Sequence, residues 1–241
     1  MKLSSKLAEV CGIHAGDGYL RNDGHRIELD ISGNIEERDY YDNHVVPLFS
    51  GCFKIKILGR YFYPRNTYGF VIRNRTIIEK MNKLGFPYGK KTLTVQTPQF
   101  IFKSKQNTTI FLRGLFDTDG CITFESKYNK RHYYPRIILA TCSERLSKDM
   151  CHLLEKLKIR YWVQKYTPKN INENIRHIVW IRGNHEVNNW FRQIGSKNPS
   201  KLSRYKIWKK YGFCPPNTTY KERKLILNGR LNPFKFYGPV A

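Results

Sequence analysis

Long apolar runs and paired cysteines are absent from this sequence of 241 residues. No uninterrupted run reaches the roughly 18 apolar residues of a membrane-spanning helix, so we expect no membrane association. The six cysteines are scattered without a CxxC pair, which argues against a zinc ribbon, a redox motif or a disulfide scaffold. The first residues, MKLSSKLAEVCGIHAGDG, are too polar to predict a secretory signal. We therefore expect an intracellular protein that is cytoplasmic or nucleoid-associated, or organellar in a eukaryote.

Acidic residues are scarce. The chain has 19 Asp and Glu against 43 Lys and Arg, a formal net charge of +24. Such a surplus opposes compaction through self-repulsion, and its commonest reason is a polyanionic partner. Since 40% of the residues are hydrophobic, the chain can still build a core. No basic amphipathic helix suggests a membrane surface, so the composition favours nucleic acid as the partner.

Two short segments repeat one pattern. The segment VCGIHAGDGYL covers residues 10–20, and LRGLFDTDGCI covers residues 112–122. Each contains a small-residue helix pattern that ends in Asp-Gly. Asp17 and Asp119 are 102 residues apart, which is about the length of one domain.

Each half of the chain, beginning with its repeat, predicts the same order of elements: helix, strand pair, helix, strand pair, helix. The sequence therefore predicts an α+β fold with two domains, residues 1–100 and residues 101–241. The predicted linker is Thr97–Asn107, and the second domain carries a basic C-terminal extension that we expect to be irregular from Cys214. In the first half we predict helices at 35–49 and 76–84 and strands at 26–32, 54–57 and 69–73. In the second half we predict helices at 144–157 and 186–194 and strands at 136–141, 161–166 and 177–182.

The two repeats resemble the motif of the LAGLIDADG homing endonuclease family. The first copy has Ala15 in place of the first acid of the motif, and only its later acid, Asp17, is present. The resemblance implies a monomer of two pseudo-symmetric αββαββα domains, each with a four-stranded antiparallel sheet that forms half of a DNA-binding saddle. The second copy matches the nine-letter name at Leu112, Gly114, Leu115, Asp117, Asp119 and Gly120, and the first at Gly12, Asp17 and Gly18.

Small residues recur four positions apart in both copies: Gly12 with Gly16, and Gly114 with Thr118. Residues at this spacing share one helix face, so two such helices can pack with their backbones nearly touching. That packing would bring the two Asp-Gly ends together. Two carboxylates forced close together repel each other and stay ionised cheaply only with a cation between them. Oxygen ligands beside a phosphate substrate favour Mg²⁺.

The resemblance also implies an activity. Members of the family are site-specific endonucleases that break both strands of a long double-stranded DNA target by Mg²⁺-dependent hydrolysis and leave short 3′ overhangs. Asp17 and Asp119 occupy the positions of the catalytic, metal-binding acids. A lysine after the last helix of each repeat acts near the scissile phosphate in related members. Lys91 and Lys201 both lie six residues beyond a glycine that ends such a helix, Gly85 and Gly195, while Lys90 and Lys197 stay open as alternatives.

Other candidates are assigned structural or DNA-contacting roles. We expect Asp117 to stabilise the turn rather than to bind metal, and His14 to be a core or interface residue. Two rival functions use the same fold: an RNA-binding intron maturase and a non-catalytic DNA-binding regulator. A start at Met and an end without His-Asn favour a free-standing or intron-encoded protein over an excised intein. The polar sheet positions expected to contact DNA are Arg26, Glu28, Asp30, Lys54, Lys56, Arg73, Arg75 and Arg136.

Overall fold

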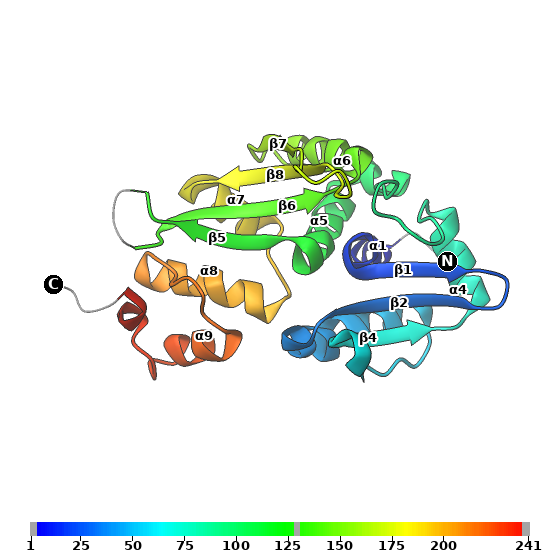
Figure 1. The fold of residues 1–241 in the computed structure, drawn as a ribbon, viewed down its shortest axis with the longest axis horizontal. Coiled ribbons are helices and arrows are strands. Elements are labelled where there is room, and N and C mark those ends of the chain that lie inside the picture. Colours follow the sequence, from blue (N-terminus) through cyan, green and yellow to red (C-terminus); the bar gives the residue numbers. More distant parts are fainter. Residues whose placement is uncertain (1–3, 128–130, 238–241) are drawn as a thin grey trace.

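Two halves of one plan make up the computed structural model, which describes residues 4–127 and 131–237 (Figure 1). In the first half one helix leads into a four-stranded antiparallel sheet with the order β1-β2-β4-β3. Its main elements are α1 (Ser5–Asp17), β1 (Gly18–Asn22), β2 (Ile27–Asn34), β3 (Arg60–Phe62), β4 (Thr67–Ile72) and α4 (Arg75–Lys83).

The second half repeats this topology in a sheet with the order β5-β6-β8-β7. The predicted α+β fold with two four-stranded antiparallel sheets is thereby confirmed. Its elements are α5 (Lys105–Asp119), β5 (Cys121–Glu125), β6 (Tyr134–Thr141), α6 (Glu144–Lys156), β7 (Trp162–Tyr166), β8 (Arg176–Arg182) and α7 (Asn184–Gln193).

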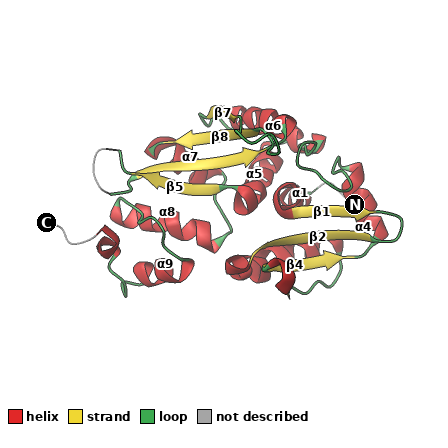
Figure 2. Cartoon of the chain, viewed as in Figure 1, coloured by secondary structure: helices red, strands yellow, loops and turns green. Residues whose placement is uncertain are grey.

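Each sheet has one face against helices and one open face. In Figure 2 the strands lie in front and most of the helices of each half lie behind them. The inward side chains, such as Leu29 and Ile31 on β2 and Ile137 and Leu139 on β6, are buried, and their neighbours along the strand point outward. This alternation is the period of two that the sequence shows in these segments. In the described part of the chain, no helix is both long enough and apolar enough to cross a membrane.

Helical segments connect the strands and follow the second sheet. A continuous helical stretch joins β2 to β3, and η3 (Tyr63–Arg65) lies between β3 and β4. The predicted linker holds η4 (Gln99–Lys103), whose Phe100 and Ile101 are buried. The connection from β2 consists of η1 (Ile35–Glu37), α2 (Arg38–Tyr40), η2 (Tyr41–Val45) and α3 (Val46–Phe53), and the C-terminal part consists of α8 (Pro199–Tyr211), α9 (Tyr220–Leu227) and η5 (Pro233–Tyr237).

Two sequence predictions are wrong in this part of the fold. Residues 54–57 form no strand, because Lys54 adopts a left-handed conformation with φ 57° that ends α3, and the chain then runs irregularly to β3 at Arg60. The arm from Cys214 is not wholly irregular, since it contains α9. A capping box, in which Thr219 and Glu222 bond each other's backbone N–H, starts that helix.

Helices α1 and α5 lie side by side between the two sheets (Figure 1). Their backbones approach so closely that a Cβ atom on Gly12 would lie 2.2 Å from the carbonyl oxygen of Phe111. A Cβ atom on Gly114 would lie 2.6 Å from the carbonyl oxygen of Glu9. The Glu9 carboxylate also accepts two hydrogen bonds from the Arg113 guanidinium, at 3.0 and 2.9 Å. Glycine at these two positions is therefore what lets the halves pack together.

Substitution of Gly12 by alanine should destabilise the protein by about 3 kcal/mol or more, because the added methyl group meets a backbone atom that cannot rotate away. The free energy of unfolding in urea measures this loss. The matched control is Gly51→Ala in α3, where the nearest atom to the new Cβ is the flexible Lys6 Nζ at 3.8 Å. That control should leave stability unchanged or raise it by about 0.5–1 kcal/mol. Equal stability of the two variants would contradict the packing described here.

Candidate active site at the ends of the two central helices

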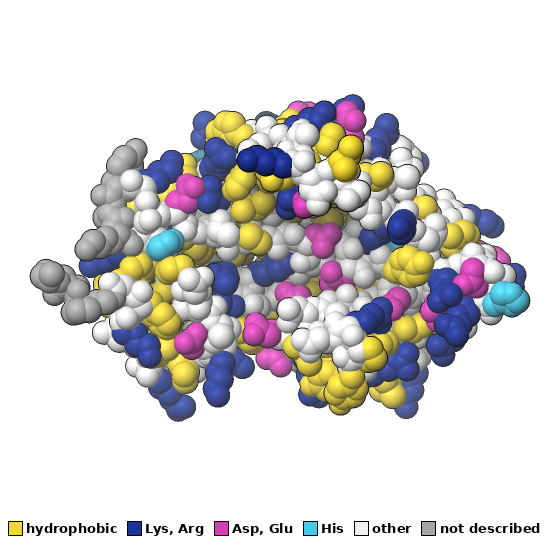
Figure 3. Space-filling model, in the orientation of Figure 1, with side chains coloured by type: hydrophobic (Ala, Val, Ile, Leu, Met, Phe, Trp, Pro, Cys, Tyr) yellow, Lys and Arg dark blue, Asp and Glu magenta, His cyan; other side chains and the backbone are white. Residues whose placement is uncertain are grey.

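Two aspartates end the central helices. Asp17 is the last residue of α1 and Asp119 the last residue of α5, and each is followed by a glycine in extended conformation that leads into a strand. The Asp119 Cγ atom lies 3.3 Å from the position that a Cβ atom on Gly16 would take, so it lies beside the last turn of α1. The helix packing therefore brings both carboxylates to one place between the sheets. Figure 3 shows acidic side chains at the centre of this face, with lysine and arginine around them.

Asp17 is held by the protein. The Tyr41 hydroxyl, from η2, donates a hydrogen bond of 2.7 Å to Asp17 Oδ2. Burial raises the pKa of Asp17 to about 7. The Tyr41 hydrogen bond opposes that rise, and the nearby carboxylates of Asp119 and Glu37 add to it. Without a cation, Asp17 is thus costly to ionise.

Asp119 has a more open environment. Its side chain is exposed to solvent on one side, yet the protein around it excludes enough water to raise its pKa. The charges of Lys91 and Lys201 act in the opposite direction. Asp119 also lines a pocket of about 280 Å³ together with Gly16, Lys91 and Arg176.

Two lysines bind the ends of the two helices in matching ways. Lys91 Nζ donates hydrogen bonds to the carbonyl oxygens of His14 (2.5 Å), Ala15 (2.7 Å) and Gly16. In the other half, Lys201 Nζ donates to the carbonyl oxygens of Phe116 and Thr118, both at 2.7 Å. These carbonyl groups form the negative ends of the helix dipoles, which stabilise a cation. Burial lowers the pKa of Lys91 to about 8 and also lowers that of Lys201.

The other two lysine candidates lie outside this arrangement. The side chains of Lys90 and Lys197 are exposed. Only the backbone N–H of Lys197 reaches the motif, where it donates to Asp117 Oδ2 at 2.7 Å. Among the four lysines, the geometry brings Lys91 and Lys201 to the aspartates, as the shared register after Gly85 and Gly195 predicts.

Asp117 is buried and fully engaged in structure. It accepts hydrogen bonds from Ser196 Oγ (2.5 Å) and from the Lys197 backbone N–H (2.7 Å), so it fixes the loop between α7 and α8. Burial raises the pKa of Asp117 to about 6. His14 is also buried, with its ring edge against Phe86, as expected for a core residue.

Sequence reasoning missed Tyr41 and Glu37. Both lie in the helical connection after β2, which the fold returns to the end of α1. Glu37 Oε1 accepts a hydrogen bond of 2.6 Å from Asn198 Nδ2, and burial raises the pKa of Glu37. No spacing to the Asp-Gly motif marks these residues, because only the course of the connection brings them near Asp17.

The residues present fit a divalent cation completed by a substrate. In the described part of the chain, no group of three or more His, Cys, Asp and Glu side chains is arranged to hold a metal ion. Mg²⁺ is commonly bound by one or two carboxylates together with phosphate oxygens and water. Asp17 and Asp119 supply those two carboxylates. A dication beside them would offset the burial that raises the pKa of Asp17 and the repulsion from Asp119 that adds to this rise.

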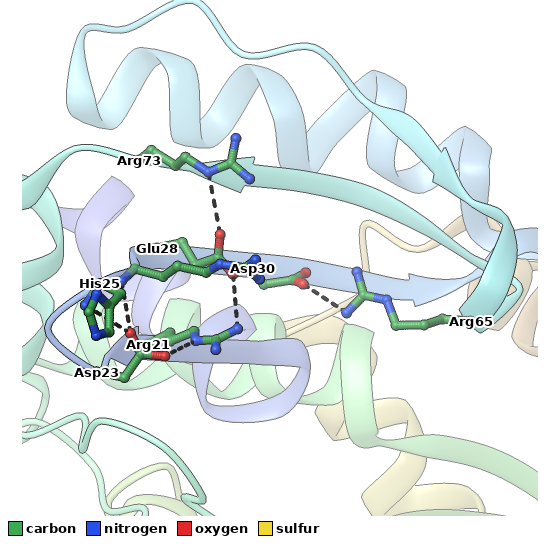
Figure 4. Close-up of polar contacts among 8 residues, drawn as sticks. Arg21, Asp23, His25, Glu28, Asp30, Arg65 and Arg73 are labelled. Carbon is green, nitrogen blue, oxygen red and sulfur yellow. Dashed lines mark hydrogen bonds and ion pairs between the residues drawn. The ribbon is translucent and has the colours of Figure 1, made fainter.

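The open face of the first sheet is covered by paired charges (Figure 4). Arg65 Nη1 lies 2.8 Å from Asp30 Oδ2 and Arg73 Nε lies 3.4 Å from Glu28 Oε2. Arg21 bridges Asp23 at 2.6 Å and approaches Glu28 at 3.9 Å. Glu28 and Asp30 therefore lie on this face as predicted, and Arg73 follows the end of β4.

The second sheet presents arginine and tryptophan, with an ion pair between Arg136 and Glu125. Arg136 from β6 and Arg182 from β8 both lie over the ring of Trp180, at 4.9 and 4.7 Å from its centroid. The remaining candidate contacts lie outside the strands. Arg26 precedes β2, Arg75 is the first residue of α4, and Lys54 and Lys56 lie in the loop before β3.

Comparisons with known proteins agree with this architecture. Residues 107–195 match the LAGLIDADG-like domain. The crystal structure of I-DmoI in complex with DNA and Mn superposes with a TM-score of 0.55, at 12% identity over 80% of this chain and 98% of that chain. The N-terminal LAGLIDADG domain of DUF199/WhiA gives a TM-score of 0.50, at 13% identity over 79% of this chain and 81% of that chain. These similarities confirm the resemblance and the fold.

A longer protein shares part of the sequence. The replicative DNA helicase DnaB of Synechocystis sp. (strain ATCC 27184 / PCC 6803 / Kazusa) is 30% identical over 115 residues, which is 47% of this chain. The match spans only 13% of the helicase. The likeness therefore concerns one segment of that protein.

The raised pKa of Asp17 makes stability depend on pH. Between about pH 4 and pH 7 the folded protein keeps a proton on Asp17 that the unfolded chain has released, so the free energy of unfolding should fall as the pH rises through this range. Asp17→Asn removes this dependence and should be more stable than the parent at pH 8, by on the order of 2 kcal/mol. Urea unfolding at pH 5 and pH 8 in EDTA measures both effects.

Asp23 serves as the control, because its pKa is lowered in the folded protein whereas that of Asp17 is raised. Hydrogen bonds from the backbone of Arg26 and from the Arg21 side chain lower the pKa of exposed Asp23 to about 2. Asp23→Asn should therefore be no more stable than the parent at pH 8. If the free energy of unfolding of the parent protein rises between pH 5 and pH 8 instead of falling, the environment of Asp17 does not raise its pKa.

Proposed function

We propose that this chain, which has the two-domain LAGLIDADG fold, is a site-specific homing endonuclease that breaks both strands of a long DNA target. The observation that carries the proposal is the pair of acids at adjoining helix ends, with two half-buried lysines beside them that are held by helix-end carbonyl groups. A purely structural role for such a cluster is costly, because burial opposes the charge of all four groups. Clusters of this kind are typical of catalytic sites.

The proposed reaction is hydrolysis of one phosphodiester bond in each strand, leaving short 3′ overhangs. Asp17 and Asp119 hold Mg²⁺, which when bound lowers the pKa of an attacking water and stabilises the leaving 3′ oxygen. Lys91 and Lys201 place a positive charge beside each acid. Since the pKa of Lys91 is about 8, this group can hold or release a proton near neutral pH and can orient water at the phosphate.

The duplex is proposed to lie across the two open sheet faces. A net charge of +24 supplies phosphate contacts and a strong dependence of binding on salt. Outward side chains of strands that enter the major groove read base edges. Because both halves are in one chain, a monomer provides both half-sites.

Cleavage distinguishes this proposal from its rivals. An intron maturase on the same fold would bind intron RNA in preference to duplex DNA, and a DNA-binding regulator would bind duplex DNA without cutting it. The presence of both acids supports the nuclease, since neither rival needs two carboxylates of raised pKa at the centre of the saddle.

A plasmid library with a randomised insert should be linearised at one recovered site in Mg²⁺ and not in EDTA. The Asp17→Asn/Asp119→Asn double variant should lose all cleavage while it keeps binding of the recovered site, because both metal-binding carboxylates are replaced by neutral amides. Gel-based cleavage and filter binding measure the two quantities. Undiminished cutting by the double variant would refute the assignment of the acids, and tight binding by the parent protein without any cutting would favour a rival function.

Replacement of a helix-end lysine should slow cleavage without preventing binding. Lys91→Met and Lys201→Met keep the length of the side chain and remove its charge, so we expect single-turnover rates to fall about 10²-fold or more. Lys90→Met and Lys197→Met are the matched controls, since these side chains are exposed. If the controls lose as much rate as Lys91→Met, the effect comes from general attraction between lysines and DNA phosphates, and not from the location of Lys91 beside the aspartates.

A further inference from the structure

Two helices of the C-terminal part lie next to the candidate active site. Helix α8 begins near the centre of the molecule, after the loop that Asp117 fixes, and α9 packs against it (Figure 1). The first turn of α8 carries Lys201, whose Nζ donates hydrogen bonds of 2.7 Å to the carbonyl oxygens of Phe116 and Thr118 at the end of α5. The position of α8 therefore decides where this amine lies.

The start of α8 is weak by its own sequence. Its first turn contains no acidic residue, and Lys201 and Arg204 lie in its first two turns. The N-terminus of a helix carries a partial positive charge, so these two cations oppose helix formation there. Asn198 caps the helix by accepting a hydrogen bond of 3.0 Å from the Ser200 backbone N–H. Contacts from outside the helix must hold the rest of these two turns in place.

Arg223 of α9 makes such contacts. Its guanidinium donates hydrogen bonds of 2.8 Å to both Ser200 Oγ and Ser203 Oγ, and a third to the carbonyl oxygen of Thr218. Ser203 Oγ in turn donates a hydrogen bond of 2.6 Å to the carbonyl oxygen of Ser200. Ser200 directly precedes Lys201 in the chain, so the guanidinium binds the helical turn that carries the amine.

The burial of Arg223 is costly. The residue is 2% exposed, and its three hydrogen-bond partners are uncharged. Burial and the charge of Arg204 lower the pKa of Arg223 to about 10, and in the described part of the chain the guanidinium forms no salt bridge. An apolar side chain would pack α9 onto α8 at a smaller cost. What such a side chain would not supply is the set of hydrogen bonds to the first turns of α8.

We propose that Arg223 is a positioning residue for Lys201: through Ser200 and Ser203 it holds the start of α8, so that the amine of Lys201 stays at the end of α5. The C-terminal helices are thereby part of the machinery of the site, although Arg223 acts on it only through α8. The inference rests on the proposed function for the effect of Lys201 on DNA cleavage, whereas the position of the amine can be measured without DNA.

The ammonium group of Lys201 reports its own position. Hydrogen bonds slow the exchange of ammonium protons with water, so ¹⁵N NMR of the free protein at slightly acidic pH should show this group, and the Lys201→Met spectrum assigns it. In Arg223→Met its protons should exchange at least about tenfold faster, because the carbonyl groups no longer hold the amine. The signal of Lys91, which is held by the end of α1, is the internal control and should stay unchanged. Unchanged exchange at Lys201, or equal acceleration at both lysines, overturns the proposal.

A double-mutant cycle shows whether Arg223 acts through Lys201. With the recovered DNA site, Arg223→Met should lower the single-turnover cleavage rate by about tenfold and leave binding unchanged. In the Lys201→Met background the same substitution should change the rate by less than about twofold, because the amine that it positions is gone. Equal losses of rate in the two backgrounds would show an effect independent of Lys201 and overturn the proposal.

The matched control is Lys224→Met. It removes a positive charge from the next residue of α9, which is exposed and whose Nζ lies 3.9 Å from Asp39 Oδ2. This variant should cleave at the parent rate. A loss of rate as large as that in Arg223→Met would attribute the effect to the charge of α9 and overturn the proposal.

Ser200→Ala tests the proposal if Arg223→Met does not fold. This variant keeps the guanidinium and removes only the acceptor next to Lys201. The cleavage rate should fall by about threefold, the value of one ordinary hydrogen bond, and the Lys201 ammonium protons should exchange faster. A variant that shows neither effect overturns the proposal.

The two kinds of measurement separate this inference from the proposed function. Faster exchange at Lys201 in Arg223→Met, in a protein that cuts no DNA, overturns the nuclease while the positioning role stands. Slower cleavage by Arg223→Met with unchanged exchange at Lys201 overturns the positioning role while the nuclease stands.

Discussion

The contact between α1 and α5 at Gly12 and Gly114 decides where the two helix-end acids and their lysines lie. Two helices with larger residues at these positions would stand several ångströms further apart. Their C-terminal residues, Asp17 and Asp119, would then no longer lie next to each other. The same contact sets the two sheets on either side of the acids, so the proposed active site and the proposed DNA-binding surface follow from a single packing constraint.

The close packing has an electrostatic cost that the rest of the site offsets. Bringing two carboxylates together where the protein limits their access to water opposes their ionisation, and partial burial of Lys91 and Lys201 opposes the charge of the amines. The helix-end carbonyl groups bind both amines, which leaves the carboxylates as the under-compensated groups. A dication bound by these carboxylates would therefore stabilise the folded protein.

Much of this arrangement could be predicted from the sequence, because it depends on local signals. Asp-Gly after a small-residue helix face is a short-range pattern that led to Asp17 and Asp119. The family resemblance implied a lysine after the last helix of each repeat, and the equal distance from a helix-ending glycine favoured Lys91 and Lys201. Tyr41 and Glu37 lack such a signal, since the course of the helical connection after β2 alone carries them to the site. The alternation at 54–57 imitates a strand, but the left-handed turn at Lys54 breaks it. Alternation predicts a strand only where a neighbour is available to pair with it.

The open faces of the two sheets share a topology and differ in side chains. The central strand of the first sheet has two carboxylates paired with arginines, whereas the second sheet has two arginines over one tryptophan, one of which also pairs with Glu125. A palindromic sequence would offer both faces the same pattern of base edges, and only one of them could match it. Under the proposed function, a DNA target that fits both faces has no dyad in its sequence. Duplication within one chain makes this possible, since a substitution in either repeat alters one arm of the target and leaves the other unchanged. If the proposed function holds, such a protein can adapt to changes in its target one half at a time, which a symmetric dimer cannot do.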